Sequence, residues 1–161
     1  IFEELLALQL GLLKLKGRRK VRTKAVLKTD HTDAFLKLLP FKPTGAQERA
    51  MRECCADMAS GYPMNRLLQG DVGSGKTAVA AGIIYTAVKN GYQCALMAPT
   101  EILAAQHAET LLEMLGSAGI KTDLLTGSTS KKEKRRIKEA LIDGETDLVI
   151  GTHALDRKSV V

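Results

Sequence analysis

The sequence predicts an α/β fold in which short parallel strands alternate with helices. Four apolar runs of strand length occupy residues 66–69, 94–98, 122–125 and 148–150. Stretches with helical apolar spacing follow the first three runs, at residues 76–89, 101–115 and 131–142, and glycine-containing turns end them. Because strands that alternate with helices of this length are joined by right-handed crossovers, the sheet should be parallel and covered on both faces.

The length of 161 residues predicts one domain with an appendage. A composition of 45% hydrophobic and 26% charged residues is typical of a folded, soluble chain. A boundary is expected near Leu39, because Pro40 and Pro43 disfavour helix in the residues before them and Thr44 can cap a helix over residues 47–59. We therefore predict a helical segment and basic linker at residues 1–38 and an α/β domain at residues 39–161.

The first segment joins a leucine-rich helical pattern to a basic run. Leucines recur at helical spacing between residues 2 and 15 with most of the circumference apolar, so this helix needs a partner surface. Gly17 ends the pattern, and residues 18–28 have neither a helical nor a strand period. Residues 1–28 hold eight Lys or Arg against two Glu, which accounts for the whole net charge of +6. The basic run is either a solvated linker or a contact for DNA or RNA.

Cysteine usage and the N-terminal pattern favour a cytoplasmic protein. Cys54, Cys55 and Cys94 form no C-x-x-C pair, so they indicate core packing rather than a zinc cluster or a disulfide framework. Charged and polar residues interrupt the leucine-rich stretch, unlike a secretory signal or a membrane span. The chain opens with Ile1, and we interpret it as an internal fragment with no membrane partner.

A glycine-rich turn carries the strongest chemical signal. Between a predicted strand and a predicted helix, the sequence fits G-x-x-x-x-G-K-[ST] with Gly70, Asp71, Val72, Gly73, Ser74, Gly75, Lys76 and Thr77. Glycines let main-chain N–H groups approach phosphate oxygens, and the helix N-terminus adds its positive end. Lys76 is expected to contact the β and γ phosphates and Thr77 to bind Mg²⁺, so these two residues are the predicted catalytic ones.

Nucleotide hydrolysis also requires carboxylates, one to hold the magnesium water shell and one to orient the attacking water. No Asp-Glu dipeptide occurs in the sequence, and no predicted strand ends in one. We therefore expect this chain to bind nucleotide without turning it over alone.

Several stretches together resemble a known family. They are residues 39–47, 65–77, 95–107, 124–128 and 150–155. In order, they are similar to an adenine-reading segment, an extended P-loop and three DNA-contacting motifs of the superfamily 2 helicases, and within these of the RecG family of bacterial branched-DNA translocases. The N-terminal helix resembles the segment that leads into the motor of that family, so the likeness covers nearly the whole chain.

The resemblance implies part of a RecA-like motor lobe that uses ATP and Mg²⁺ and acts on branched DNA, within a cytoplasmic, monomeric parent protein. It implies that Phe41 stacks beneath the adenine and that Gln47 reads the adenine edge. The DNA-contact candidates are Thr100, Thr126, Gly127, Ser128, Thr152 and His153. Hydroxyls and main-chain N–H groups of this kind bind phosphates without reading bases.

Alternatives remain open for single residues and for the function. Thr100 is also a natural helix N-cap, and a lone His153 is equally a structural histidine. The charged run at residues 131–136 is expected to be a solvated helix face above inward-facing Ile137, Leu141 and Ile142. A transcription-repair coupling translocase shares the same motor, and a P-loop switch or small kinase would have no DNA role.

Overall fold

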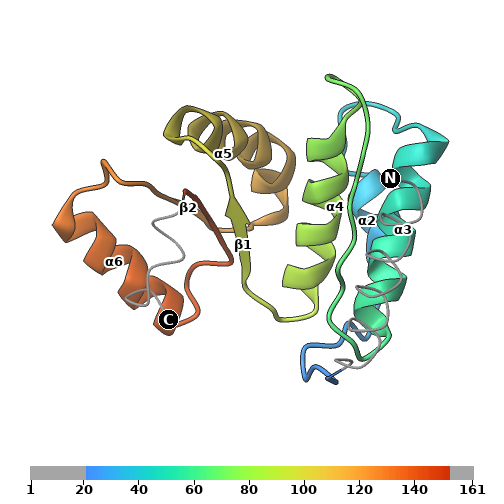
Figure 1. Cartoon of the computed structure of the whole chain (residues 1–161), viewed down its shortest axis with the longest axis horizontal. Helices are drawn as coiled ribbons and strands as arrows, with labels where there is room; N and C mark the ends of the chain where they lie inside the picture. Colours follow the sequence, from blue (N-terminus) through green and yellow to red (C-terminus); the bar gives the residue numbers. More distant parts are fainter. Residues whose placement is uncertain (1–20, 153–161) are drawn as a thin grey trace, which may run out of the picture.

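A three-stranded parallel sheet lies at the centre of the computed structural model, which describes residues 21–152 (Figure 1). The strands are β1 (Cys94–Met97), β2 (Thr122–Leu125) and β3 (Leu148–Gly151), in the spatial order β1-β3-β2. Ile150 of β3 lies opposite Leu96 on one side and Leu124 on the other. Because β3 is the central strand, all of its residues are buried. The predicted parallel sheet is confirmed.

Helices cover both faces of this sheet. The helices α4 (Lys76–Lys89), α5 (Glu101–Leu115) and α6 (Lys131–Ile142) have the predicted bounds, and a short 3₁₀ helix, η1 (Gly116–Ala118), follows α5. Side chains alternate along β3, so Leu148 and Ile150 join the core beneath α4 and α5 while Val149 packs with Ile137 of α6 on the opposite face. Successive side chains of the buried strand β3 therefore contribute to two separate cores, one on each face of the sheet.

Two further helices precede the sheet. Helix α3 (Gly45–Ala59) packs beside α4 in Figure 1, and the short α2 (Thr32–Leu36) packs on both. A capping box begins α3, in which the Thr44 hydroxyl accepts from Gln47 N and the Gln47 side chain accepts from Thr44 N. The helix expected to follow Thr44 is thus present and begins two residues earlier than predicted.

The described part of the first predicted segment is docked rather than free. Phe35 of α2 has no exposed surface and packs with Met51 and Tyr85. The main chain of residues 23–27 bonds to the end of α3, through Thr23 N to Gly61 O at 3.0 Å and Leu27 N to Met58 O at 3.3 Å. Basic side chains in this stretch are exposed, as a solvated linker requires, yet its backbone is fixed. The boundary after residue 38 stays a prediction, and the leucine-rich helix lies outside the described residues.

The first predicted strand, at residues 66–69, is absent from the sheet. This prediction was wrong: the segment pairs with no strand of the described sheet, and Arg66 instead bonds to Asp57 at 2.8 Å and Glu53 at 2.6 Å on α3. Leu67 is 87% exposed, while Leu68 is partly buried against the main core. A short segment with two central apolar residues forms a strand only where a neighbouring strand exchanges hydrogen bonds with it.

Helix α6 corrects a smaller prediction. Its charged side is exposed as expected, with Arg135 paired to Glu139 and Arg136 paired to Glu133 and Asp123. Ile137 is buried, but Ile142 is 74% exposed instead of facing inward. Residue 142 is the last of the helix and lies about 100° around the axis from Leu141, which points it away from the sheet.

The cysteines are packing residues, as predicted. Cys54 and Cys55 are buried and free, and burial raises the pKa of both thiols. Burial also raises the pKa of Cys94 to about 11. Thiols that stay protonated at neutral pH are poor nucleophiles and poor metal ligands.

Within residues 21–152, no helix is both long and apolar enough to cross a bilayer.

Candidate nucleotide-binding site and the neighbouring rim

The glycine-rich turn before α4 has the backbone shape that a phosphate-binding loop needs. Gly73 and Gly75 adopt φ values of +81° and +79°, where any side chain would be strained. Gly75 is the N-cap of α4 and supplies no side-chain cap. No side chain caps the N–H groups of Lys76 and Thr77, and these groups lie at the positive end of the helix dipole. Asp71 and Val72 are exposed, which leaves the turn accessible.

Lys76 lies across its own loop. Its Nζ donates to the main-chain oxygens of Gly70 at 2.8 Å and Asp71 at 2.6 Å. A phosphate offers negatively charged acceptors, so the ammonium group would add ion pairing to hydrogen bonds of the kind it already makes to these carbonyls. The ammonium group is exposed, so it is free to exchange these carbonyls for phosphate oxygens. Thr77 follows in the first turn, and its hydroxyl bonds to no other residue in the described part of the chain, which suits a magnesium ligand.

Gln47 links the start of α3 to the loop. Its Oε1 accepts from Thr44 N and its Nε2 donates to Ser74 O, both at 2.8 Å. A Cβ on Gly75 would collide with the same amide group, so the third glycine of the motif is required by this contact as well as by its φ. An amide side chain has two donor hydrogens and two acceptor lone pairs. One of each remains for a nucleotide base.

Phe41 precedes α3 and is 43% exposed. It belongs to none of the core clusters of the described residues, unlike Phe35 only six positions earlier. Its ring is therefore available for stacking on a planar ligand.

The loops after β1 and β2 meet at one rim of the sheet. Thr100 caps α5, because its hydroxyl accepts from Leu103 N at 3.3 Å. Next to it, Glu101 accepts from Ser128 N at 3.1 Å and from the Ser128 hydroxyl at 2.7 Å. Since β3 separates β1 from β2, this contact spans the carboxyl end of β3. Both loops follow the carboxyl ends of their strands, where parallel sheets bind their ligands.

The three rim candidates after β2 differ in accessibility. Thr126 is 5% exposed, and its hydroxyl bonds within the loop to Ser128 at 2.9 Å and Thr129 at 3.3 Å. Gly127 and Ser128 are exposed. Lys134 Nζ donates to Gly127 O at 2.9 Å and ties the loop to α6. Thr126 therefore shapes the loop, while Gly127 and Ser128 are presented outward.

The loop after β3 completes the rim. Ala98 N donates to Gly151 O at 2.8 Å, so the end of β3 lies beside the end of β1. Thr152 follows and is half-buried. His153 lies outside the described residues.

Glu101 is a rim residue whose pKa is shifted by its neighbours. The hydrogen bonds from the Ser128 hydroxyl and the Ser128 and Gly127 main chain, together with the charge of Lys134, hold the pKa of Glu101 below its usual value. The carboxylate is therefore ionised at neutral pH.

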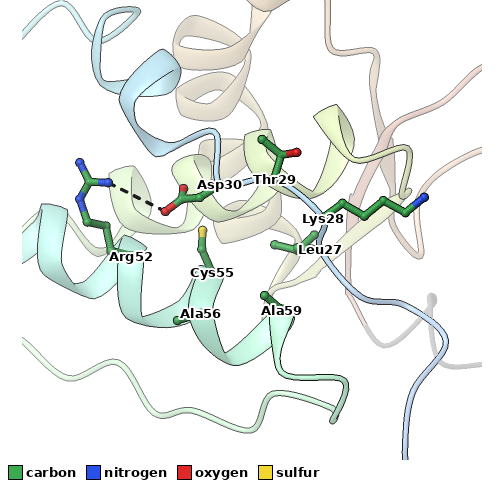
Figure 2. Close-up of a pocket in the computed structure, with 8 residues that line it drawn as sticks. All are labelled: Leu27, Lys28, Thr29, Asp30, Arg52, Cys55, Ala56 and Ala59. Carbon is green, nitrogen blue, oxygen red and sulfur yellow. Dashed lines mark ion pairs between the residues drawn. The ribbon is translucent and has the colours of Figure 1, made fainter.

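A separate cavity of about 250 Å³ lies between residues 27–30 and α3, as Figure 2 shows. Asp30 and Arg52 face each other across it at 3.9 Å, and the same guanidinium also contacts Asp33 and Glu48. No residue of the glycine-rich turn lines this cavity. We interpret it as a packing seam beneath the docked N-terminal segment.

A sequence profile decides the family. The profile described as DEAD/DEAH box helicase matches residues 44–160, from the N-cap of α3 through the glycine-rich turn and the rim. The chain belongs to the DEAD/DEAH box helicase family.

Relatives of this helicase chain support the predicted resemblance to RecG proteins. The ATP-dependent DNA helicases RecG of Bacillus subtilis and Escherichia coli K12 are 45% and 43% identical to it, each match covering 99% of this chain. Those matches cover only 24% and 23% of the relatives. The chain thus spans about a quarter of the length of these proteins.

Solved structures confirm the RecA-like helicase lobe. A structure of RecG bound to a three-way DNA junction superposes with a TM-score of 0.84 at 44% identity, covering 99% of this chain and 22% of that one. A hypothetical ATP-dependent RNA helicase from Sulfolobus tokodaii has a TM-score of 0.56 at 21% identity, covering 83% of this chain and 38% of that chain, and shows the fold alone.

Sequence reasoning missed the contacts that organise this helicase lobe. The sequence predicts Thr44 as a helix cap, but it gives no sign of the bond of Gln47 to Ser74, which joins residues 27 positions apart. Glu101 is, from the sequence, only the first residue of a predicted helix, and its bonds to Ser128 are equally distant in sequence. The only available signal was an acidic residue in the first turn of a helix, which more often serves the helix dipole.

Proposed function

We propose that this chain is the ATP-binding part of an ATP-dependent DNA helicase that remodels branched DNA, such as replication forks and four-way junctions, in recombination and repair. The observation that carries the proposal is the uncapped α4 N-terminus beneath a loop with two left-handed glycines and an exposed Lys76. The names of its relatives, DNA helicases that use ATP, support the same conclusion.

In the proposed site, the chain holds the triphosphate and its metal. Lys76 would stabilise charge on the transferring phosphoryl group, and Thr77 would bind Mg²⁺. The free donor and acceptor of Gln47 would read the adenine edge, and Phe41 would stack beneath it. Because Gln47 already bonds to Ser74, adenine recognition would act directly on the shape of the phosphate loop.

The proposed DNA contacts lie at the rim. Ser128 and Gly127 are exposed, and Thr100 combines its capping role with a hydroxyl at a helix N-terminus. Thr152 and His153 are proposed to complete the set, and Thr126, which was expected to contact DNA, is proposed to act by holding the loop in shape. Contacts of this type grip phosphates without reading bases, which suits a motor that moves along any sequence.

The proposed setting is the cytoplasm, with DNA as the partner and a monomeric whole protein. A transcription-repair coupling motor would share this lobe, and a P-loop protein without a DNA role would share only the nucleotide site. Salt-dependent binding to DNA would argue against a P-loop protein without a DNA role, because such a protein has no need to bind the phosphate backbone of DNA.

We predict that this chain binds Mg·ATP but does not release phosphate faster when junction DNA is added. The sequence contains no Asp-Glu pair to hold the magnesium water shell and orient the attacking water. Calorimetry would establish binding, and a phosphate-release assay with and without DNA would measure turnover. Lys76→Ala sets the background rate, and DNA-stimulated release clearly above that background would contradict the prediction.

The excess positive charge before residue 28 predicts a contribution to DNA affinity. Deleting residues 1–28 should lower nonspecific affinity, but that deletion also removes the buried Leu27. A cleaner change replaces Arg18, Arg19 and Lys20 with glutamine. If these residues contact phosphates, the slope of log affinity against log salt should flatten by up to about 2.7.

The matched control replaces three exposed basic residues, Lys37, Arg49 and Lys121, with glutamine. Both triple variants lose the same net charge. If the salt titrations of the two triple variants superimpose, the change in DNA affinity is due to net charge alone. The basic run is then a solvated linker.

A further inference from the structure

Ser128 has two outward donors, and both are already bonded to a carboxylate. Its N–H donates to Glu101 Oε1 at 3.1 Å and its hydroxyl to Glu101 Oε2 at 2.7 Å. Two oxygens of one anion thus bind one main-chain N–H and one hydroxyl. A phosphate group would use the same pair of donors in the same way.

The surroundings favour this arrangement. Glu101 lies in the first turn of α5, where the helix dipole stabilises a negative charge. A Cβ on Gly127 would lie 2.7 Å from Glu101 Oε1, so only glycine permits the close approach of the carboxylate to the loop. Lys134 also holds the loop, through a hydrogen bond to Gly127 O. Both Glu101 and Ser128 are exposed, so the contact is open to an incoming ligand.

We propose that Glu101 is an internal competitor for DNA phosphate at Ser128, and so determines how tightly the rim grips the DNA backbone. This inference rests on the proposed function of the rim. A phosphate can take both Ser128 donors only when the Glu101 carboxylate withdraws, because each hydrogen serves one strong acceptor at a time. The nearby negative charge also repels the phosphate when Glu101 stays in place. The contact therefore lowers the affinity of Ser128 for DNA phosphate. A motor that moves along DNA must release each phosphate, so a lower affinity suits it.

The test is the Glu101→Gln substitution in the chain of residues 1–161. Binding of a fluorescent three-way DNA junction is measured at several salt concentrations. The amide removes the charge and weakens the hold on Ser128, so affinity should rise roughly three- to tenfold at low salt and less at high salt. Glu113→Gln is the matched control, because Glu113 is exposed on the same helix three turns away and its substitution changes the net charge equally.

Ser128→Ala separates competition from a general charge effect. If Glu101 acts through Ser128, less than half of the gain should survive when Glu101→Gln is combined with Ser128→Ala. A full gain in the double variant, or an equal gain from Glu113→Gln, would overturn the inference. Weaker binding by Glu101→Gln would also overturn it, because the carboxylate would then be a support for the loop.

Two further measurements distinguish a failure of the proposed DNA rim from a failure of the proposed competition by Glu101. In the free protein, the Ser128 amide resonance should shift in Glu101→Gln, whereas resonances of the α6 core should not. If Ser128→Ala and Thr100→Ala both bind the junction as the unchanged chain does, the proposed DNA rim itself fails. If Ser128→Ala weakens binding and Glu101→Gln does not strengthen it, only the competition fails.

Discussion

Replacing Lys76 with alanine will weaken Mg·ATP binding by about 10- to 100-fold, since a hydrogen bond to a charged group contributes about 1.5–3 kcal/mol. The fold should be unaffected. Among residues 21–152, the exposed ammonium group hydrogen-bonds only to the main-chain oxygens of Gly70 and Asp71 and, more distantly, to the Ser74 hydroxyl. Removing it takes no apolar surface from the core, so the free energy of unfolding should change by no more than about 0.5 kcal/mol.

Isothermal calorimetry with Mg·ATP and Mg·ADP measures this effect. Lys131→Ala is the matched control, because Lys131 is the first residue of α6 just as Lys76 is the first residue of α4. Lys131→Ala should bind nucleotide normally. Equal affinities for the Lys76→Ala and unchanged chains would remove the basis of the proposed nucleotide site.

Phe35→Ala will lower the free energy of unfolding by about 3–5 kcal/mol. The ring has no exposed surface, and its centroid lies 5.6 Å from that of Tyr85. It also fills the space above Gly82, where a Cβ would lie only 3.0 Å from Phe35 Cδ1. The neighbouring backbone cannot collapse fully into the cavity left by the ring, because α3 and α4 are fixed by their packing on each other.

Urea denaturation followed by circular dichroism measures the loss. Phe41→Ala is the control, because it is the same substitution on a ring that lies outside the core clusters, and it should cost far less stability. A similar small loss for both variants would indicate that residues 27–36 are dispensable for the lobe. Phe41→Ala should instead lower the affinity for Mg·ATP if its ring stacks on adenine.

The sequence alone determined the features that local interactions control. The bounds of α4, α5 and α6 were predictable because a capping residue or glycine begins each helix and a glycine lies at or just beyond its end. The glycine-rich turn was predictable because its pattern specifies both a backbone shape and a charge. Alternation of these helices with short apolar runs was enough to predict the parallel sheet and its covered faces.

Only the tertiary structure decided which apolar and charged groups meet across long stretches of sequence. Residues 66–69 were expected to form a strand, but they lie outside the described sheet, and Arg66 forms ion pairs with Glu53 and Asp57 of α3. Phe35 belongs to the core because α3 and α4 create a space for it, which no local pattern encodes. The bonds of Gln47 to Ser74 and of Glu101 to Ser128 connect segments 27 residues apart. Such contacts depend on how the elements pack, and packing is a property of the whole fold rather than of any one segment.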